Sequence, residues 1–341
     1  MRDLTLWSWP DAPRSGEDHA GAPDDNRADW LYVRIACQTG EMDAILLDLV
    51  APLAQQLWKA GLIRQCFFIR YAEGGHHVRV RFFGKQRELL GPGRSLVDAS
   101  IQAYFAEGQQ HVLAPLDPGP EGMNDQSWQP RYAAQAPRPI PSYEYQRYEP
   151  EIERYGGPHG LRVSEQHFAS SSAVALRVLA WEREGYGSRR NAAILLLHAS
   201  AESFQLDAQQ KALCFEQFYL RRLALAWRTP PEQNHLAQEY ARQRTGLHLL
   251  VSDGACAPAR RCQAVWGPLV EHWRRKLGDT YRLLQRLQEQ DRLATPPIAL
   301  LSAYIHMLCN RLGIYQREET YLCYFLYRLY TEHLALSRVS G

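Results

Sequence analysis

The stretch CFFIRYAEGGHHVRVRFFGK, residues 66–85, decides the fold of this chain. A β-rich segment over residues 66–71 is followed by a glycine-containing turn, AEGGH, and by the alternating run HVRVRFF over residues 77–83. Two β-type runs separated by a short loop that contains glycine predict a β-hairpin. The hairpin is therefore the first element from which the rest of the fold can be placed.

Strand alternation in the second arm sends His77, Arg79 and Arg81 to one face and the intervening apolar residues to the other. Two arginines two positions apart on a strand stand about 7 Å apart, a spacing that suits the two carboxylates of one small ligand. Guanidinium binds carboxylate through paired hydrogen bonds and keeps its charge. The alternative interpretation is the solvated outer face of an amphipathic strand.

The flanking sequence predicts an α+β fold. Strands are expected over residues 29–38 and 143–151, and helices over 41–61 and 94–107, so that the order up to about residue 150 is β-α-β-β-α-β, the ferredoxin-like pattern. A sheet layer in the N-terminal half would then pack with a mostly helical C-terminal half. Helices are expected at 164–183, 188–204, 207–227, 231–244, 261–290, 296–311 and 316–336.

Composition limits the class of protein. Of the 341 residues, 45% are hydrophobic, which is enough to bury a sizeable core. We expect a flexible N-terminal segment over residues 1–28, rich in Asp, Pro, Gly and Ala, and one domain over residues 29–336. The net charge of +2 gives no reason to expect direct binding of nucleic acid. No apolar run reaches the length of a membrane span.

Cysteine usage and the N-terminus bear on the compartment. The 7 cysteines form no CxxC pair and have no zinc-type spacing, so reduced thiols of a cytoplasmic protein are expected, without a metal site. The N-terminus lacks the apolar core of a secretory signal. We therefore expect a soluble cytoplasmic protein that does not associate with membranes.

The segment EPEIERYGG, residues 149–157, places Glu151 three positions before Arg154 and two glycines after Tyr155. This spacing allows an ion pair if the segment is helical. Glycine permits a positive φ and a close approach of the backbone to a ligand. The alternative is a surface ion pair before a turn, which contributes little to stability.

The segment IHMLCNRLG, residues 305–313, places one histidine, His306, on an otherwise apolar helix. Imidazole exchanges protons near neutral pH, so this residue is a candidate general acid or base. Asn310 and Glu319 are candidates for orienting the ring. The alternative is a histidine whose hydrogen bonds are satisfied within the core.

Four segments in this order resemble a known family: FFIRYAEGGHHVRVRF, YEPEIERYGG, SEQHFASSS and HMLCNRLG. The chain resembles the lantibiotic-dehydratase C-terminal domain, also called the thiopeptide-type bacteriocin biosynthesis domain. The resemblance runs from about Trp30 to about Tyr330. The ordered combination is specific, although no single segment is.

The resemblance implies an activity. In full-length dehydratases a large N-terminal region transfers glutamate from glutamyl-tRNA onto Ser or Thr of a precursor peptide. The C-terminal domain then eliminates that glutamate as a lyase, which gives dehydroalanine or dehydrobutyrine. The chain matches the elimination part alone, so it is expected to be the second half of a split dehydratase in thiopeptide or lanthipeptide antibiotic biosynthesis.

The resemblance also implies partners. One is a ribosomally made precursor peptide, with a leader and a core rich in Ser, Thr and Cys. The other is a separate tRNA-dependent glutamylating protein. Full-length family members tend to be dimers, so a homodimer is compatible with the resemblance. No metal or other cofactor is required by the expected reaction.

The family's elimination residues match five positions of this sequence: Arg79, Arg81, Glu151, Arg154 and His306. Of these residues, His306 is the candidate base that removes the α-proton. The three arginines are expected to hold the glutamyl group and stabilise the departing carboxylate. Glu151 is expected either to position Arg154 or to balance the excess positive charge. His77 and Tyr155 are added as candidate substrate-binding residues.

Two other functions remain open. A divergent branch of the family forms the pyridine of thiopeptides by a formal 4+2 cycloaddition between two dehydroalanines, with loss of the leader peptide. The full set of five residues favours elimination, because cycloaddition has no glutamyl leaving group. The third possibility is a non-catalytic scaffold that binds the leader or the glutamylating partner.

Overall fold

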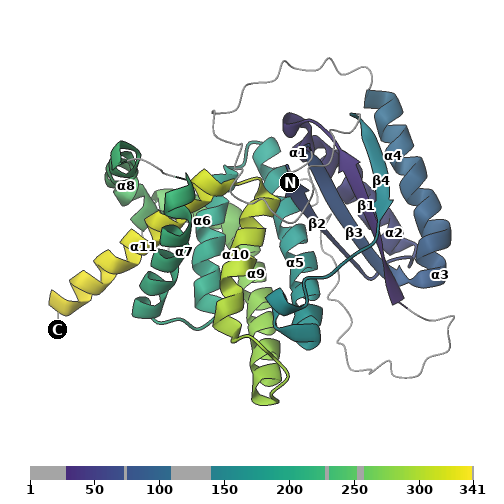
Figure 1. Ribbon diagram of the computed structural model, residues 1–341. Coiled ribbons are helices and arrows are strands. Elements are labelled where there is room, and N and C mark those ends of the chain that lie inside the picture. The colour runs from purple at the N-terminus through teal and green to yellow at the C-terminus, as the bar shows by residue number, and fades with distance from the viewer. Residues whose placement is uncertain (1–27, 73–74, 109–139, 227–229, 252–256, 340–341) are drawn as a thin grey trace. The chain divides into compact units, whose positions relative to one another are not determined.

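The computed structural model describes residues 28–72, 75–108, 140–226, 230–251 and 257–339 (Figure 1). The expected flexible segment 1–28 lies, apart from its last residue, outside the described residues. The chain forms two compact units: a first unit of Met1–Pro150 with Phe168–Leu179, and a second unit of Glu151–His167 with Ala180–Gly341. The single domain predicted over residues 29–336 stays a prediction, and its residues are divided between the two units.

Four antiparallel strands form the sheet of the first unit, in the order β2-β3-β1-β4. Helices connect β1 to β2 and β3 to β4, so this is the ferredoxin-like arrangement that the sequence predicts. The last strand is shorter than predicted and ends at Gln146. The strands are β1 (Ala28–Ala36), β2 (Gln65–Tyr71), β3 (His77–Lys85) and β4 (Ser142–Gln146).

The helical connections in the first unit change their hydrogen-bonding pattern along their length. Pro52 lies at the start of α2, directly after a π-helical segment, so the proline stands where the helical hydrogen-bonding pattern changes. The predicted helix 41–61 is therefore confirmed as several consecutive segments. These segments are η3 (Thr39–Glu41), α1 (Met42–Ala44), η4 (Ile45–Val50) and α2 (Ala51–Lys59). The connection after β3 consists of α3 (Gln86–Glu88), η5 (Leu89–Gly93) and α4 (Arg94–Gly108).

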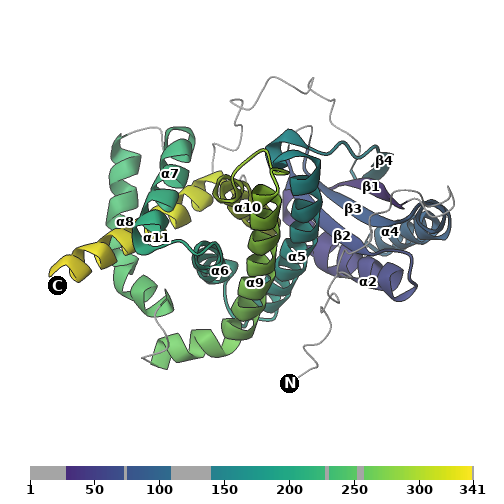
Figure 2. The same ribbon diagram turned by 90° about the horizontal axis from the view of Figure 1, so that it is seen from below.

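The apolar side of β3 forms the centre of the first unit's core. Val78, Val80 and Phe82 are all 0% exposed, and α2 and α4 lie on one side of the sheet (Figures 1 and 2). The opposite side of β3 is not a solvated face, because His77 is also 0% exposed and Arg81 is 8% exposed. The interpretation of this stretch as an ordinary amphipathic surface strand is therefore wrong.

Part of a long helix, α5 (Gly157–Arg183), belongs to the first unit through its residues 168–179. The Phe168 ring meets the Phe67 ring edge-on, with centroids 5.4 Å apart. The backbone N–H of Phe68 donates to the Ser172 Oγ at 3.1 Å. Because β2 is an edge strand, this contact satisfies a backbone donor that would otherwise be open to pairing.

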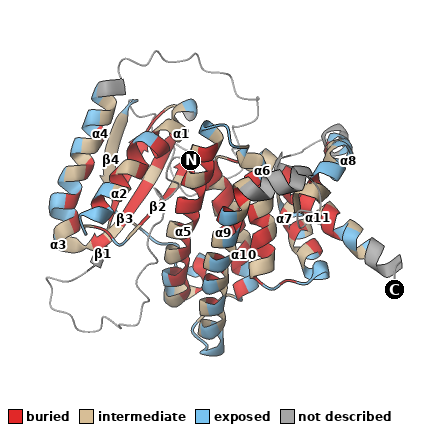
Figure 3. Cartoon of the chain, turned by 180° about the vertical axis from the view of Figure 1, so that it is seen from behind, coloured by how far each residue is buried: buried red, intermediate tan, exposed pale blue. Residues whose placement is uncertain are grey.

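Within the described residues of the second unit the regular elements are helices, and each helix predicted after residue 161 is present. The apolar stripe predicted on the helix that carries His306 is buried: Leu301, Tyr304, Ile305 and Leu308 are each at most 2% exposed (Figure 3). Its elements are η7 (Glu153–Tyr155), the ends of α5, α6 (Arg189–Ser203), α7 (Ala208–Ala226), α8 (Pro230–Val251), α9 (Ala257–Glu289), α10 (Pro297–Leu312) and α11 (Gln316–Val339).

The predicted α+β class is thus confirmed. Of the helices that the structure describes, none is both long enough and apolar enough to cross a membrane.

Replacing Phe82 by Ala should lower the free energy of unfolding by about 3–5 kcal/mol, because the change removes a fully buried ring and leaves a cavity. Chemical denaturation followed by circular dichroism measures this. Leu90, at 43% exposed, is the control: Leu90→Ala should change stability by no more than about 0.5 kcal/mol. Equal effects of the two substitutions would show that β3 does not form the core as described.

Candidate active site

In the first unit, the side of the sheet opposite α2 and α4 carries Arg34, His77, Arg79 and Arg81, and we call it the arginine face. Arg34 lies directly opposite Arg79 on the neighbouring strand, where like charges repel. Glu144, opposite Arg34 on the other side, forms an ion pair with it at 3.3 Å. The charge of Arg34, which is 2% exposed, is therefore balanced within the sheet.

Arg79 is held by two contacts that leave its charge unbalanced. Its Cζ lies 3.6 Å from the centroid of the Tyr71 ring, a cation–π arrangement. Its Nε donates to the Nε2 of His77 at 2.9 Å. Among the residues that the structure describes, no carboxylate pairs with Arg79. A fixed, half-buried guanidinium of this kind is suited to bind a carboxylate from a ligand.

His77 is held in one tautomer. Its Nδ1 lies 2.6 Å from the Gly75 carbonyl oxygen, which can only accept, so the ring proton is on Nδ1 and Nε2 is the acceptor for Arg79. The Arg34 Nη2 at 3.2 Å from Nδ1 is then a neighbouring cation and not a donor to the ring. Because His77 has no exposed surface, any contribution it makes to binding passes through Arg79.

The ionisation of His77 agrees with this tautomer. Burial, together with the charges of Arg34 and Arg79, lowers the pKa of His77 to about 3, although the hydrogen bond to the Gly75 carbonyl acts in the opposite direction. The ring is therefore neutral at physiological pH. A neutral ring can accept the Arg79 hydrogen bond, whereas an imidazolium could not.

Arg81 lies among three aromatic rings. Its Cζ is 4.4 Å from the centroid of Tyr32, 5.1 Å from that of Tyr148 and 5.3 Å from that of Phe67. These rings come from β1, the segment after β4, and β2, so the position of the guanidinium depends on the whole sheet. The contacts restrain a long side chain that would otherwise lose rotamer freedom on binding a ligand.

In the second unit, the RYGG segment contains the ion pair that its spacing allows. The Arg154 Nη1 lies 3.0 Å from the Glu151 Oε2, and both side chains are substantially exposed. Gly156 and Gly157 have φ values of 78° and 91°, in the left-handed region that favours glycine. A Cβ at Gly156 would also lie 2.7 Å from the Leu293 Cδ1, so the Leu293 side chain would have to move to admit a larger residue.

Tyr155 connects the RYGG segment to the helix that carries His306. It is 4% exposed, and its ring stacks on that of Tyr304 at 6.4 Å. The Tyr304 hydroxyl is 2.7 Å from the Ser164 Oγ, which fixes the second ring. The Arg154 Cζ lies 5.6 Å from the Tyr155 ring centroid. The tyrosine thus supports Arg154 from within the core.

His306, on α10, is oriented by a buried carboxylate. Its Nδ1 lies 2.9 Å from the Oε2 of Glu319 on α11. The Glu319 side chain is 1% exposed, whereas that of His306 is 39% exposed. Of the two residues that the sequence proposes for orienting the ring, Glu319 is the one hydrogen-bonded to it.

Arg222, on α7, pairs with the other Glu319 oxygen at 3.2 Å. A buried carboxylate needs such compensation, because removing its charge from water is costly. Sequence reasoning missed Arg222, because it lies in a short basic pair that resembles a solvated helix face.

This arrangement defines a histidine–glutamate pair. A carboxylate at Nδ1 keeps the ring proton there and leaves Nε2 as the basic nitrogen, which is also how a carboxylate orients the histidine of a catalytic triad. Within the described part of the chain, Nε2 of His306 has no hydrogen-bond partner. The pair can therefore accept a proton from a substrate and stabilise the imidazolium that forms.

The predicted site residues thus fall into two groups. His77, Arg79 and Arg81 are neighbours on β3 in the first unit. The RYGG segment and His306 belong to the second unit. No group of three or more His, Cys, Asp or Glu side chains suited to a metal ion occurs among the described residues.

The family model for the C-terminal part of lantibiotic biosynthesis dehydratases matches residues 30–330, so the chain belongs to this family. No curated protein matches the chain.

Solved structures share the fold. TbtD, a pyridine synthase from thiomuracin biosynthesis, has a TM-score of 0.70 and 18% identity, over 90% of this chain and 99% of TbtD. TsrL has a TM-score of 0.64 and 18% identity, over 91% of this chain and 96% of TsrL. MibB, a tRNA-dependent lantibiotic dehydratase from Microbispora sp. 107891, has a TM-score of 0.57 and 22% identity; 94% of this chain aligns with 29% of MibB.

The free energy of unfolding should fall as the pH decreases from about 6.5 toward about 3, in part through His77 and His167. Burial lowers the pKa of each to about 3, from an ordinary value of 6.5. In this range the unfolded chain binds protons that the native chain does not, at a cost of about 1.4 kcal/mol per pH unit for each residue.

Chemical denaturation at a series of pH values measures this dependence. Carboxylates also titrate there, so the informative comparison is with His77→Gln, which should show a shallower decrease than the unsubstituted chain. An identical slope in the two proteins would mean that His77 is not buried in its neutral form.

Proposed function

We propose that this chain eliminates glutamate from O-glutamylated Ser and Thr residues of a ribosomally made precursor peptide, which yields dehydroalanine and dehydrobutyrine. In this proposal it is the second half of a split dehydratase. A separate tRNA-dependent protein attaches the glutamate, and this chain removes it in the cytoplasm. The observation that carries the proposal is the pairing of His306 with the buried Glu319.

The chemical step needs one base and one stabilised leaving group. The Nε2 of His306 takes the α-proton, the electrons of the Cα–H bond form the Cα=Cβ double bond, and the Cβ–O bond breaks. Glutamate leaves as a carboxylate with the electron pair of the Cβ–O bond. Glu319 stabilises the imidazolium formed in the first part of the step, and the ion pair with Arg222 holds the Glu319 side chain in its buried position.

The arginines would bind the free carboxylate of the glutamyl unit and the ester carboxyl group, which becomes a carboxylate as the Cβ–O bond breaks. Arg79 supports this role best, because it is held in place and lacks a carboxylate partner among the described residues. Arg81, restrained by its aromatic neighbours, provides a second fixed guanidinium. Arg154 can exchange its exposed partner Glu151 for a substrate carboxylate at little cost, because exposed ion pairs are weak.

Cycloaddition to a pyridine, with loss of the leader peptide, is the second candidate. It is favoured by the likeness to TbtD, which extends over 99% of that chain. At 18% identity the likeness to TbtD shows a shared fold, and it does not show a shared reaction. A didehydro peptide offers no glutamyl group to the arginine face, whereas an O-glutamyl ester offers one free carboxylate and one departing carboxyl group. A scaffold without activity is the remaining alternative, and it has no need of an oriented imidazole.

Incubation of an O-glutamylated precursor peptide with the chain should produce a mass loss that corresponds to glutamic acid. Mass spectrometry of the peptide measures this loss. His306→Ala should slow this reaction by about 10²–10⁴-fold, because the general base is lost. The isosteric Glu319→Gln should give a smaller decrease in kcat, since it keeps a hydrogen-bond acceptor and removes only the charge. The matched control is His235→Ala, an exposed histidine on α8, which should react at the rate of the unsubstituted chain.

If the glutamyl peptide stays unmodified while a didehydro peptide is cyclised and loses its leader, the chain catalyses cycloaddition and not elimination. Tight binding of the precursor with neither reaction would indicate a scaffold. If the His306→Ala variant eliminates glutamate at the normal rate, the assignment of His306 as the base is wrong, although elimination remains the reaction.

Substitutions of His77 separate its two hydrogen bonds. Gln places an acceptor near the position of Nε2 and can keep the Arg79 contact, whereas Asn places a donor near Nδ1 and can keep only the Gly75 contact. His77→Asn should therefore raise KM for the glutamyl peptide by about tenfold or more, and His77→Gln should remain near the unsubstituted value.

Steady-state kinetics of both variants, after their melting temperatures have been compared, tests this positioning role. If His77→Asn keeps the KM of the unsubstituted chain and His77→Gln does not, His77 stabilises the turn at Gly75 and does not act through Arg79.

A further inference from the structure

A pocket lies within the second unit, among residues that the proposed elimination does not use. Its volume is about 390 Å³, within the range of small-molecule sites. Helices α6, α7, α8 and α11 form its walls. Its polar lining consists of His198, Lys211, His248, Tyr330 and His333, and its other lining residues are aliphatic.

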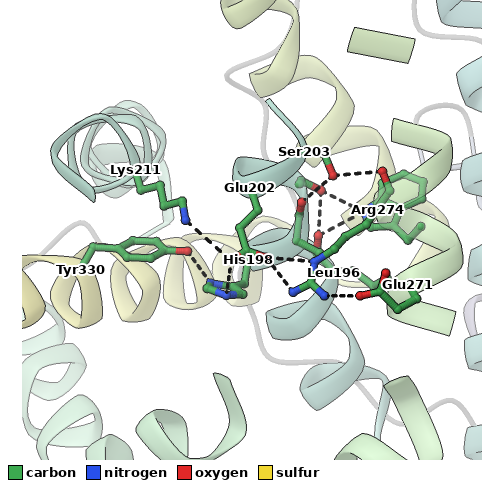
Figure 4. Close-up of polar contacts among 11 residues, drawn as sticks. Leu196, His198, Glu202, Ser203, Lys211, Glu271, Arg274 and Tyr330 are labelled. Carbon is green, nitrogen blue, oxygen red and sulfur yellow. Dashed lines mark hydrogen bonds and ion pairs between the residues drawn. The ribbon is translucent and has the colours of Figure 1, made fainter. Parts of the chain in front are cut away.

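The polar lining is basic. It includes three imidazoles and one ammonium group, and no carboxylate lines the pocket within the described part of the chain. The nearest acidic group on one side is Glu202, which is shared by several bases (Figure 4). Its carboxylate lies 3.2 Å from the His198 Nε2, 3.8 Å from the Lys211 Nζ and 2.6 Å from the Arg274 Nη2.

A second carboxylate, that of Glu332, also contacts three basic groups, one of which is the lining residue His248. Its oxygens lie 2.7 Å from the Arg244 Nε, 3.3 Å from the His248 Nε2 and 3.7 Å from the Arg328 Nη2. Each of the two carboxylates is therefore surrounded by three basic groups. Arg274 also pairs with Glu271 at 2.6 Å. The charged group that lines the pocket itself is the ammonium of Lys211, whose contact with Glu202 is the longest of the three that Glu202 makes.

The hydrogen bonds leave Lys211 as the cation best placed to meet a ligand. The Tyr330 Oη lies 2.5 Å from the His198 Nδ1. Burial raises the pKa of Tyr330, so its hydroxyl stays protonated and donates to Nδ1, while Nε2–H of the same ring donates to Glu202. Both His198 nitrogens are thus engaged. Among the described residues the ammonium of Lys211 has only the longer contact to Glu202 and the Tyr330 ring at 5.7 Å.

We propose that this pocket binds a small carboxylate with an apolar body, in which the Lys211 ammonium meets the carboxylate and the aliphatic wall meets the body. Leu249, Val251 and Leu329 supply the aliphatic lining. A free amino acid is excluded, because its ammonium group would face a basic lining that contains no carboxylate. The ligand is thus distinct from the glutamate released by the proposed elimination, and the inference does not depend on that function.

Isothermal titration calorimetry of the full chain with 4-methylpentanoate tests the proposal. Saturable binding to one site is expected, and the isosteric cation 4-methylpentylamine should not bind. Lys211→Met keeps the length of the side chain and removes its charge, so it should weaken binding by about tenfold or more. The matched control Lys59→Met changes an exposed lysine of the first unit and should bind as the unsubstituted chain does.

A second variant, Ala208→Phe, places a large ring at a lining residue of the pocket and should abolish binding without a change of charge. It also keeps the test decisive if the lysine variant does not fold. The proposal is overturned if 4-methylpentanoate does not bind at millimolar concentrations, or if the amine binds equally well. It also fails if both pocket variants bind normally, or if inorganic phosphate binds and the carboxylate does not.

Discussion

The structure depends on the two-residue alternation of β3. A strand sends successive side chains to opposite faces, so one run of nine residues supplies both the centre of the core and the arginine face. Val78, Val80 and Phe82 are fully buried on one side. A shift of the strand by one residue would move charged groups into that core, and the register is therefore fixed by the same residues that position Arg79 and Arg81.

Two imidazoles in the chain are each held in one tautomer by an acceptor at Nδ1. For His77 the acceptor is the Gly75 carbonyl, and for His306 it is the carboxylate of Glu319. In both rings Nε2 is consequently the basic nitrogen. The difference lies in exposure, because His77 is fully buried and holds Arg79, whereas the His306 side chain is 39% exposed and is available to a substrate. The same local chemistry thus gives a positioning residue in one place and a candidate base in the other.

The sequence was sufficient for the fold wherever periodicity was strong. The order of strands and helices, the alternation in β3 and the apolar stripe of α10 all follow from side-chain spacing. It was insufficient for burial of the arginine face, because the aromatic rings around Arg81 come from distant strands and only the assembled sheet brings them together. Arg222 could not be predicted for the same reason: no local pattern marks an arginine whose partner is a buried carboxylate on another helix.

The central claim is that this chain removes the α-proton of an O-glutamylated residue and releases glutamate. Its most direct test is the time course of free glutamate formed from an O-glutamylserine peptide, compared with the same peptide deuterated at the serine Cα. The account predicts that glutamate appears together with dehydroalanine in equal amounts, and more slowly from the deuterated peptide. The absence of glutamate release from either peptide, with a folded protein, would contradict it.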